Sequence, residues 1–283
     1  PHFKAGDRPA GIGDWELEEL LGVGGFGEVW KAANPHLGGA AALKFCFNPR
    51  MAEVLRNEAA LLRRVMQQGR HPGIVRLQHT YLSADPPALE YEYVAGGDLA
   101  ALIRQWHQAP GACRAEDALR LLRELAEVVA FAHRLSPPIV HRDLKPANIL
   151  LEAGADGGVS LRVADFGIGG IAWQAGAAPP HGSAPATPAL TLLRGAHTPL
   201  YASPQQIEGQ PPDPRDDVHA LGVLWYQLLT GNLALSSVPA EWQDELAERQ
   251  VPGAVVRLLG SCLAARAERR PADAGALAAA LAE

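Results

Sequence analysis

Cysteines, basic residues and long apolar runs are all scarce in this sequence, and each scarcity excludes a class of protein. Only three cysteines occur among 283 residues, at Cys46, Cys113 and Cys262. An odd number at such wide spacing forms neither a disulfide framework nor a zinc-ligand pattern, so buried, reduced thiols are expected. Lysine and arginine together number 25 against 31 aspartates and glutamates, a formal net charge of −6. A nucleic-acid-binding surface normally needs a basic patch, so no nucleic-acid partner is expected.

The sequence also lacks any run of about 18 apolar residues, so no membrane-spanning segment is expected within it. The first 14 residues contain no apolar stretch of the kind found in signal peptides. They do not begin with methionine, which suggests a piece of a longer protein whose anchor or sensor lies elsewhere. The prediction is a cytoplasmic location, and the cytoplasmic part of a longer, membrane-anchored protein stays open as an alternative.

What is present is typical of a globular protein, with 48% hydrophobic and 20% charged residues. A chain of this length can form one large domain or two closely joined lobes. The N-terminal third combines short apolar stretches with one amphipathic stretch, which predicts a sheet with one helix. The expected strands lie within Leu20–Ala32, on both sides of a glycine turn, and at Ala40–Phe47, Ile74–Leu82 and Ala88–Val94, and the expected helix is Met51–Gln68.

The remainder of the chain is predicted to be mainly helical. The expected helices are Ala115–Leu135, Asp217–Thr230 with Gly231 as its stop, Val251–Leu263 and Pro271–Leu281, and one strand is expected at Gly158–Ala164. Residues 168–197 are rich in proline, alanine, glycine, serine and threonine without a hydrophobic period, which predicts a long loop.

The first motif with chemical content is a G-x-G-x-x-G-x-V pattern formed by Gly22, Gly24, Gly27 and Val29. Glycines allow a backbone turn to lie close to phosphate groups, where a Cβ atom would intrude. A dinucleotide-binding turn has the same spacing, but it needs a helix directly after the last glycine and an acidic residue about 20 positions on. Here residues 28–32 continue as a strand, so a glycine hairpin over a nucleotide is favoured.

A lysine inside the next apolar strand is the second motif, Ala42-Leu43-Lys44. Burying an ammonium group is costly unless it is paired, and Glu58 on the following helix is the expected partner. A lone lysine in such a strand would more often reach the surface. Because Lys44 follows the glycine turn, it is better interpreted as holding the α- and β-phosphates of a nucleotide.

Two later motifs are the most specific feature of the sequence. His141–Leu150 has the sequence HRDLKPANIL, and Asp165-Phe166-Gly167 follows the expected strand at 158–164. In this order, after a glycine turn and a lysine, the chain resembles eukaryotic-type serine/threonine protein kinases over nearly its whole length, most of all bacterial signalling kinases. The lysine of Asp-Leu-Lys-Pro is typical of the serine/threonine branch, because tyrosine kinases usually lack it.

The resemblance implies ATP as substrate, Mg²⁺ as cofactor and protein hydroxyls as phosphate acceptors. It implies that Asp143 orients the acceptor hydroxyl and that Lys145 neutralises the γ-phosphate during transfer. Asn148 and Asp165 would supply oxygen ligands to two Mg²⁺ ions, which prefer oxygen. Thr198 matches the threonine that bonds the catalytic aspartate and lysine, which supports the same branch.

The resemblance also assigns the adenine site. The backbone of Glu92 and Val94 would bind the adenine edge as a hinge, and Val29, Ala42 and Leu150 would hold its faces. Tyr91 would be the gatekeeper at the back of this site. A hydrophobic column typical of active kinases is implied at Leu62, Leu77, His141 and Phe166, with Asp217 as its anchor.

The chain departs from the family at the end of its activation segment. The usual Ala-Pro-Glu triplet is replaced by Ser203-Pro204-Gln205, and the partner of the usual glutamate is best matched by Arg270. A neutral hydrogen bond contributes about 1 kcal/mol, against roughly 1.5–3 kcal/mol for a charge-assisted one. A looser activation segment is therefore expected, although not an inactive enzyme. The segment is also long for the family.

Regulation by loop phosphorylation is a further expectation. In this family the arginine beside the catalytic aspartate, here Arg142, commonly meets a phosphorylated loop residue. Thr191 is the first candidate and Thr187 the second, because Thr198 is reserved for the active site. In the alternative, these hydroxyls stay unmodified and Arg142 is satisfied by water or a backbone carbonyl.

Together these features predict an α+β protein with the bilobal protein-kinase fold. Residues 14–283 would form the kinase domain, with residues 14–94 as a β-rich N-terminal lobe and hinge, residues 95–283 as a mainly α-helical C-terminal lobe, and residues 1–13 as an extension. The predicted function is an active, autophosphorylating serine/threonine kinase. The alternatives are a pseudokinase acting as a nucleotide-binding scaffold, and a metabolite or antibiotic kinase, which would usually lack the D-L-K-P-x-N signature. The protein substrate, the activating signal and the oligomeric state are not specified by the sequence.

Overall fold

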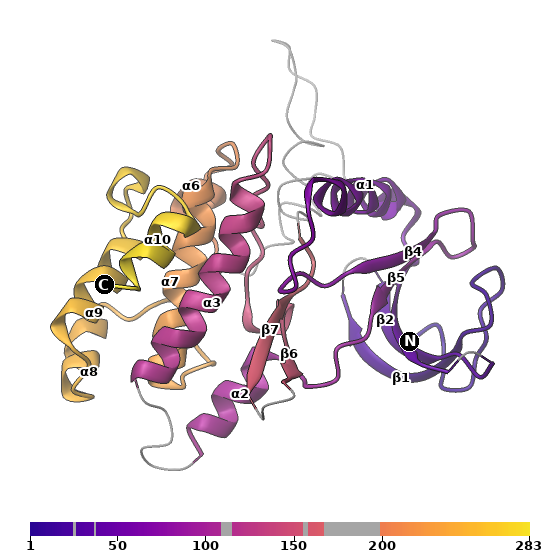
Figure 1. Ribbon diagram of the computed structural model, residues 1–283, viewed down its shortest axis with the longest axis horizontal. Coiled ribbons are helices and arrows are strands. Elements are labelled where there is room, and N and C mark those ends of the chain that lie inside the picture. Colours follow the sequence, from indigo (N-terminus) through magenta and orange to yellow (C-terminus); the bar gives the residue numbers. More distant parts are fainter. Residues whose placement is uncertain (25–26, 37, 109–114, 155–157, 167–198) are drawn as a thin grey trace, which may run out of the picture.

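The structure is a computed structural model that describes residues 1–24, 27–36, 38–108, 115–154, 158–166 and 199–283. The chain forms two lobes, a sheet-rich N-terminal lobe and a mainly helical C-terminal lobe, as Figure 1 shows. This is the α+β bilobal kinase arrangement predicted from the sequence, and that prediction is confirmed.

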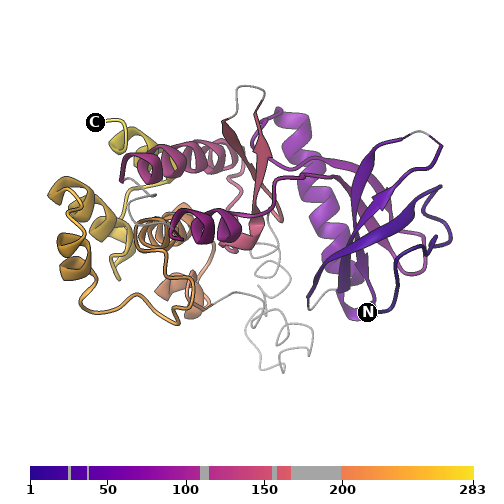
Figure 2. The same cartoon turned by 90° about the horizontal axis from the view of Figure 1, so that it is seen from below.

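The N-terminal lobe is a five-stranded antiparallel sheet with the order β1-β2-β3-β5-β4. Its strands are β1 (Glu16–Val23), β2 (Gly27–Ala33), β3 (Ala40–Cys46), β4 (Leu77–Tyr81) and β5 (Ala88–Glu92). A short 3-10 turn, Pro49–Met51, leads into α1 (Ala52–Gln68), which lies against the sheet in Figure 2. Successive side chains of β3 point to opposite faces of the sheet. Leu43 and Phe45 therefore lie on one face, and Ala42 and Lys44 lie on the other. The sheet therefore separates a packing face from a face available to the active site.

The first residues of the chain pack onto the small lobe. Phe3 lies over Phe45, with ring centroids 4.8 Å apart, and His2 stacks on Phe47 at 3.9 Å. Ile12 has no exposed surface and belongs to the same hydrophobic cluster as Phe45. Residues 1–13, named above as an extension, thus cover one face of the sheet.

The C-terminal lobe is built around one buried helix, α7 (Pro214–Thr230), which packs against α3 and α9. Asp213 and Asp216 form a capping box at its first turn, and Gly231 ends it in a left-handed conformation, as predicted. The helix begins three residues earlier than expected because of this cap. The other elements are α2 (Leu99–Trp106), α3 (Ala115–His133), 3-10 turn Pro146–Asn148, β6 (Ile149–Ala153), β7 (Val159–Val163), α6 (Pro204–Ile207), α8 (Trp242–Glu248), α9 (Gly253–Cys262), 3-10 turn Ala267–Arg269 and α10 (Ala274–Ala280).

Some predicted elements differ from the structure. β4 starts at Leu77 rather than Ile74, because the residues before it pair with β7 instead. The last helix begins after the capping residue Asp273, so Pro271 lies outside it. α2, α6, α8 and β6 were not predicted, since each is at most eight residues long, which is shorter than the window of about 11 residues over which a periodic pattern is recognised. The loop predicted for residues 168–197 lies outside the described residues.

The stretch between α1 and β4 is fastened to the large lobe. The Val75 amide donates to the carbonyl of Val163 at 2.9 Å, and the Val163 amide donates to the carbonyl of Gly73 at 2.7 Å. A Cβ atom on Gly73 would lie 2.3 Å from a methyl carbon of Val128, so the close approach requires glycine. These contacts fix the C-terminal end of α1 relative to the large lobe.

Two of the cysteines are described, and both Cys46 and Cys262 are buried free thiols, as expected. Cys113 lies outside the described residues. Across the described part of the chain, no helix is both long and apolar enough to cross a membrane.

The packing of the N-terminal residues gives a stability prediction. Ile12→Ala should lower the free energy of unfolding by about 2–4 kcal/mol, because it leaves a cavity in a fully buried site. Ile207→Ala is the matched control, since Ile207 is 60% exposed and its change should stay within about 0.5 kcal/mol. Urea unfolding followed by tryptophan fluorescence measures both. Equal effects of the two substitutions would show that residues 1–13 are not part of the folded lobe.

Candidate active site

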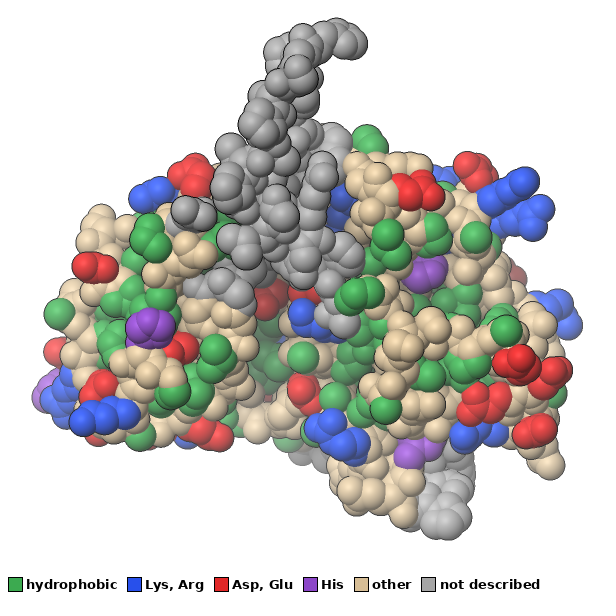
Figure 3. Space-filling model, turned by 180° about the vertical axis from the view of Figure 1, so that it is seen from behind, with side chains coloured by type: hydrophobic (Ala, Val, Ile, Leu, Met, Phe, Trp, Pro, Cys, Tyr) green, Lys and Arg blue, Asp and Glu red, His purple; other side chains and the backbone are tan. Residues whose placement is uncertain are grey.

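The predicted site residues lie where the two lobes face each other. Lys44 is on β3, Glu58 is on α1, and Asp165 follows β7 by two residues. Asp143 and Asn148 lie between α3 and β6. Figure 3 shows acidic and basic side chains together in the hollow between the lobes. Four separate segments of the chain therefore contribute to one site.

Lys44 is the centre of this arrangement. Its Nζ donates to Oε1 and Oε2 of Glu58, at 2.9 and 3.1 Å, and to Oδ1 of Asp165 at 3.0 Å. Lys44 is only 6% exposed and Glu58 is fully buried. A buried ammonium group is tolerated when carboxylates surround it in this way. The pairing of Lys44 with Glu58 agrees with the prediction, and the contact with Asp165 adds a second carboxylate.

Charge determines how these three groups titrate. Burial alone would lower the pKa of Lys44, but the charges of Asp165 and Glu58 together outweigh burial and raise it. Burial raises the pKa of the Glu58 carboxyl, and the charge of Lys44 opposes this rise. For Asp165, burial is also opposed by the charge and hydrogen bond of Lys44, which together hold its pKa below the ordinary value. Asp165 therefore stays ionised near neutral pH, which is compatible with its predicted role as a metal ligand.

A tyrosine hydroxyl holds Glu58 from its other side. Tyr91 is buried on β5, opposite Ala42 of β3 and Leu77 of β4, and its OH donates to Oε1 of Glu58. Burial, and then the charge of Glu58, raise the pKa of Tyr91 well above its ordinary value, so the phenol remains a donor. Tyr91 was predicted to lie behind the adenine site, but its bond to Glu58 was not predicted, because the two residues are 33 positions apart and no local pattern marks the contact.

The loop between α3 and β6 brings three polar side chains together. Lys145 Nζ donates to Oδ2 of Asp143 at 2.8 Å. Asn148 Nδ2 donates to the backbone carbonyl of Asp143 at 2.7 Å and to its Oδ2 at 3.1 Å. The Ala164 amide donates to the carbonyl of Asn148 at 2.8 Å, which places the loop next to Asp165. The predicted residues thus form one connected network.

Asp217, in the first turn of α7, binds the backbone of this loop. It is fully buried and accepts hydrogen bonds from the amides of His141 at 2.7 Å and Arg142 at 2.8 Å, and from Nε2 of His133 at 2.8 Å. Although burial would raise the pKa of Asp217, these hydrogen bonds and the nearby histidines lower it. Arg142 has a φ of 61° and Asp165 a φ of 57°, in the left-handed region that non-glycine residues rarely adopt. Such strain concentrates at functional sites, where the surroundings enforce it.

The predicted hydrophobic column is present. Leu62, Leu77, His141 and Phe166 are all buried, and the rings of His141 and Phe166 have centroids 4.8 Å apart. Nε2 of His141 also forms a hydrogen bond with the carbonyl oxygen of Ala164, at 2.9 Å. The column therefore links α1 and β4 of the small lobe to the catalytic loop above Asp217.

The donor set at the lobe interface suits Mg²⁺. Hard cations take carboxylate and amide oxygens, with phosphates and water completing the octahedron. The bonds from Asn148 Nδ2 to Asp143 turn the amide oxygen of Asn148 away from that residue. Asp165 uses Oδ1 for Lys44, and about a third of its side chain is exposed. In the described ranges, no group of three or more histidine, cysteine or acidic side chains is arranged so that it could hold a metal ion by itself.

The glycine hairpin joins β1 and β2. Gly24 and Gly27 exchange two backbone hydrogen bonds, at 2.9 and 3.2 Å. Gly27 has a φ of 152°, and a Cβ atom there would lie 2.2 Å from the carbonyl oxygen of Phe45. Open space surrounds the Cβ positions of Gly22 and Gly24. Strand packing thus requires glycine at position 27, whereas a Cβ atom at Gly22 or Gly24 would meet no neighbouring atom within 4 Å.

The expected adenine contacts lie beside the segment that joins the lobes. Glu92 ends β5, and the half-buried Val94 follows it. Val29, Ala42 and Leu150 are also half-buried, as expected for residues that line a cleft. These positions are compatible with the predicted roles, which remain predictions.

Comparison with known proteins decides the family. The protein kinase domain family matches residues 15–278. This chain belongs to the protein kinase family. Serine/threonine-protein kinase A of Synechocystis sp. is 29% identical over 91% of this chain and 50% of its own length. Serine/threonine-protein kinase pkn2 of Myxococcus xanthus is 34% identical over 78% of this chain and 25% of its own length. The kinase domain thus spans half or less of these relatives.

A solved structure supports the fold. The kinase domain of Mycobacterium tuberculosis PknI has a TM-score of 0.70, with 23% identity, over 99% of this chain and 98% of that chain. At this identity the likeness shows the fold alone. The resemblance to serine/threonine kinases that the sequence motifs suggested is confirmed by the family match.

The kinase domain retains a link at the end of its activation segment. Arg270 Nη2 donates to Oε1 of Gln205 at 2.8 Å, which is the expected neutral hydrogen bond. Gln205 Nε2 donates to the carbonyl of Ala265 at 2.9 Å, a bond that a glutamate could not make. The side-chain amide of Gln205 thus lacks the charge of a glutamate but makes a second hydrogen bond. This second bond partly offsets the expected loosening of the activation segment.

Arg142 is engaged within the kinase's large lobe. Its Nε donates to Asp216 at 2.9 Å and its Nη2 to the carbonyl of Gln210 at 2.7 Å. This corresponds to the alternative in which a backbone carbonyl satisfies the arginine, with a buried carboxylate added. The pairing of Arg142 with Asp216 was not predicted from the sequence. Thr198, Thr191 and Thr187 lie outside the described residues, so their assigned roles remain predictions.

The hydrogen bond from Tyr91 yields a prediction about the kinase's stability. Tyr91→Phe should lower the free energy of unfolding by roughly 1.5–3 kcal/mol, because the donor to a buried carboxylate is lost without a change of shape. Tyr93→Phe is the control, since Tyr93 is the next tyrosine along the hinge and faces Lys31 instead. Its effect should stay within about 0.5 kcal/mol. If urea titrations give the same change for both variants, Tyr91 does not hold Glu58.

Proposed function

We propose that this chain is the catalytic domain of an active serine/threonine kinase that transfers the γ-phosphate of Mg·ATP to hydroxyl groups of proteins and of itself. The observation that carries this proposal is the paired Lys44, bonded at once to Glu58 on α1 and to Asp165 beside the catalytic loop. Family membership supports phosphoryl transfer, and the serine/threonine kinases among the relatives support the acceptor type.

Phosphoryl transfer requires mainly positioning and charge neutralisation. Lys44 would bind the α- and β-phosphates, with Glu58 fixing its ammonium group. Asn148 and Asp165 would bind Mg²⁺, which when present neutralises charge that develops on the phosphates. The hairpin with Gly22, Gly24 and Gly27 would cover the phosphates from above.

At the acceptor, Asp143 would orient the hydroxyl and accept its proton. Lys145 already donates to Oδ2 of Asp143, so its charge lies where the γ-phosphate would pass. Asn148 holds the same carboxylate in place through its amide. Thr198 would complete this group from the activation segment.

The adenine base would lie between Val29 and Ala42 of the sheet and Leu150 of β6. The backbone of Glu92 and Val94 would bind its edge. No observation among the described residues favours the pseudokinase alternative, because the lysine, both aspartates and the asparagine are retained. A cytoplasmic location is part of the proposal, since ATP and protein acceptors are available there.

The catalytic role is tested by Asp143→Asn. We expect phosphate transfer to fall at least about 100-fold, because the group that accepts the hydroxyl proton is lost. Nucleotide affinity should change less than about threefold, since no ATP contact is assigned to Asp143. Labelled Mg·ATP with a generic protein substrate measures transfer, and calorimetry measures binding. Transfer by the variant at the parent rate would refute the assignment.

The metal role is tested by Asp165→Asn. The variant should lose at least about tenfold in Mg·ATP affinity while binding metal-free adenosine almost unchanged, because a charged metal ligand is replaced by a neutral one. Asp244→Asn, on the exposed surface of α8, is the control for removing a negative charge elsewhere. Calorimetric titrations with and without Mg²⁺ distinguish the two. A parent protein whose ATP affinity does not depend on Mg²⁺ would favour a pseudokinase.

A further inference from the structure

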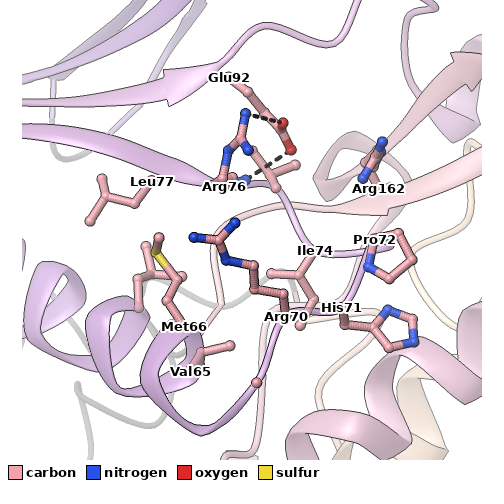
Figure 4. Close-up of a pocket in the computed structure, with 13 residues that line it drawn as sticks. Val65, Met66, Arg70, His71, Pro72, Ile74, Arg76, Leu77, Glu92 and Arg162 are labelled. Carbon is pink, nitrogen blue, oxygen red and sulfur yellow. Dashed lines mark hydrogen bonds and ion pairs between the residues drawn. The ribbon is translucent and has the colours of Figure 1, made fainter.

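A second cavity lies outside the catalytic cleft, between the end of α1, the stretch leading into β4, the hinge and β7. Its volume is about 250 Å³. Leu62, Val65 and Met66 come from α1, residues 69–77 form one side, and Glu92 and Arg162 close it. Figure 4 shows these side chains around the cavity. Glu92 lines this cavity and is also one of the proposed adenine contacts.

The cavity has an apolar floor. Leu62, Val65, Ile74 and Leu77 are buried members of the large hydrophobic core, and Met66 packs against it. Two of them, Leu62 and Leu77, also belong to the column that connects the small lobe to the catalytic loop. A ligand on this floor would therefore touch residues that the active arrangement depends on.

The rim of the cavity carries more positive than negative charge. Arg162 is paired with Glu152, at 3.0 Å from Nε to Oε2, and Arg76 is paired with Glu92 at 3.6 Å. Arg70 has no hydrogen-bond or ion-pair partner among the residues that the structure describes. In Figure 4 the dashed lines join Arg76 to Glu92, and none reaches Arg70. On a chain with a net charge of −6, this leaves a local site for one anionic group.

The same rim is connected to the hinge. The Glu92 amide donates to the carbonyl of Arg76 at 3.0 Å, and the Arg76 amide donates to Oε1 of Glu92 at 3.0 Å. Together with the ion pair, these bonds form a latch between the start of β4 and the end of β5. An anion that binds the guanidinium group of Arg76 must compete with the carboxylate of Glu92 for it.

We propose that this cavity binds a small amphipathic carboxylate, with its apolar part on the floor and its carboxylate between Arg70 and Arg76. The volume suits an aromatic ring with a short chain rather than a drug-sized molecule. Binding weakens the side-chain part of the latch, so the carboxylate and the nucleotide lower each other's affinity. This coupling rests on the proposed adenine contact of Glu92, whereas the site itself does not.

The test uses 3-phenylpropanoate as the probe and 3-phenylpropanamide as its uncharged counterpart. From the efficiency typical of small ligands, the acid should bind with a Kd of roughly 0.1–1 mM, and the amide at least about tenfold more weakly. Calorimetry or ligand-observed NMR on the whole chain reads binding without any need for catalysis. Saturating acid should weaken ADP binding about fivefold.

Variants locate the site. Arg70→Gln should weaken the acid about tenfold, and Met66→Trp should abolish binding by filling the floor. Arg63→Gln is the matched control, because Arg63 lies on α1 outside the cavity and donates to Thr80. Circular dichroism verifies that each variant is folded.

Several results would overturn the proposal. The site would be ruled out if the acid and the amide bound equally well, or if the Arg70→Gln variant bound the acid as tightly as the parent does. It would also be ruled out if the acid did not bind at about 10 mM. Binding of the acid without any change in ADP affinity would rule out the coupling. Failure of the kinase proposal would appear instead as absent phosphate transfer, with probe binding unaffected.

Discussion

The whole active arrangement depends on burying the ammonium group of Lys44. An ammonium ion that loses its water costs several kcal/mol unless carboxylates and hydrogen bonds replace that water. Lys44 meets this requirement through Glu58 of α1 and Asp165 from the other side of the cleft. One electrostatic constraint on a single strand therefore fixes the position of a helix and of the Asp165 carboxylate, the proposed metal ligand.

Other contacts make this geometry stable. Tyr91 bonds Glu58 from the hinge strand, and the Gly73 and Val75 bonds to Val163 hold the end of α1 against the large lobe. Below the cleft, Asp217 holds the catalytic loop through two backbone amides. The column between these anchors connects the two lobes, and the proposed coupling of the neighbouring cavity to nucleotide binding acts through the ion pair of Arg76 with Glu92.

The local parts of this account could be predicted from the sequence. The glycine turn, the buried lysine and its partner on the next helix follow from patterns within a few dozen residues. The pairing of Arg142 with Asp216 and the bond from Tyr91 to Glu58 could not be predicted, because they join residues 74 and 33 positions apart and no periodicity marks them. The packing of Ile12 under the sheet was missed for the same reason. The observed starts of α7 and α10 differ from the predicted ones, because the capping residues Asp213 and Asp273 determine where these helices begin and the apolar pattern does not.

If Glu58 contributes to phosphate transfer only by holding Lys44, the two residues should be fully coupled in a double-mutant cycle on kcat/KM. The cycle compares Lys44→Met, Glu58→Gln and the double variant in phosphate transfer from Mg·ATP. The account predicts that Glu58→Gln reduces kcat/KM in the parent but causes no further loss once Lys44 is replaced. Losses that multiply in the double variant would contradict it, since the two residues would then act independently.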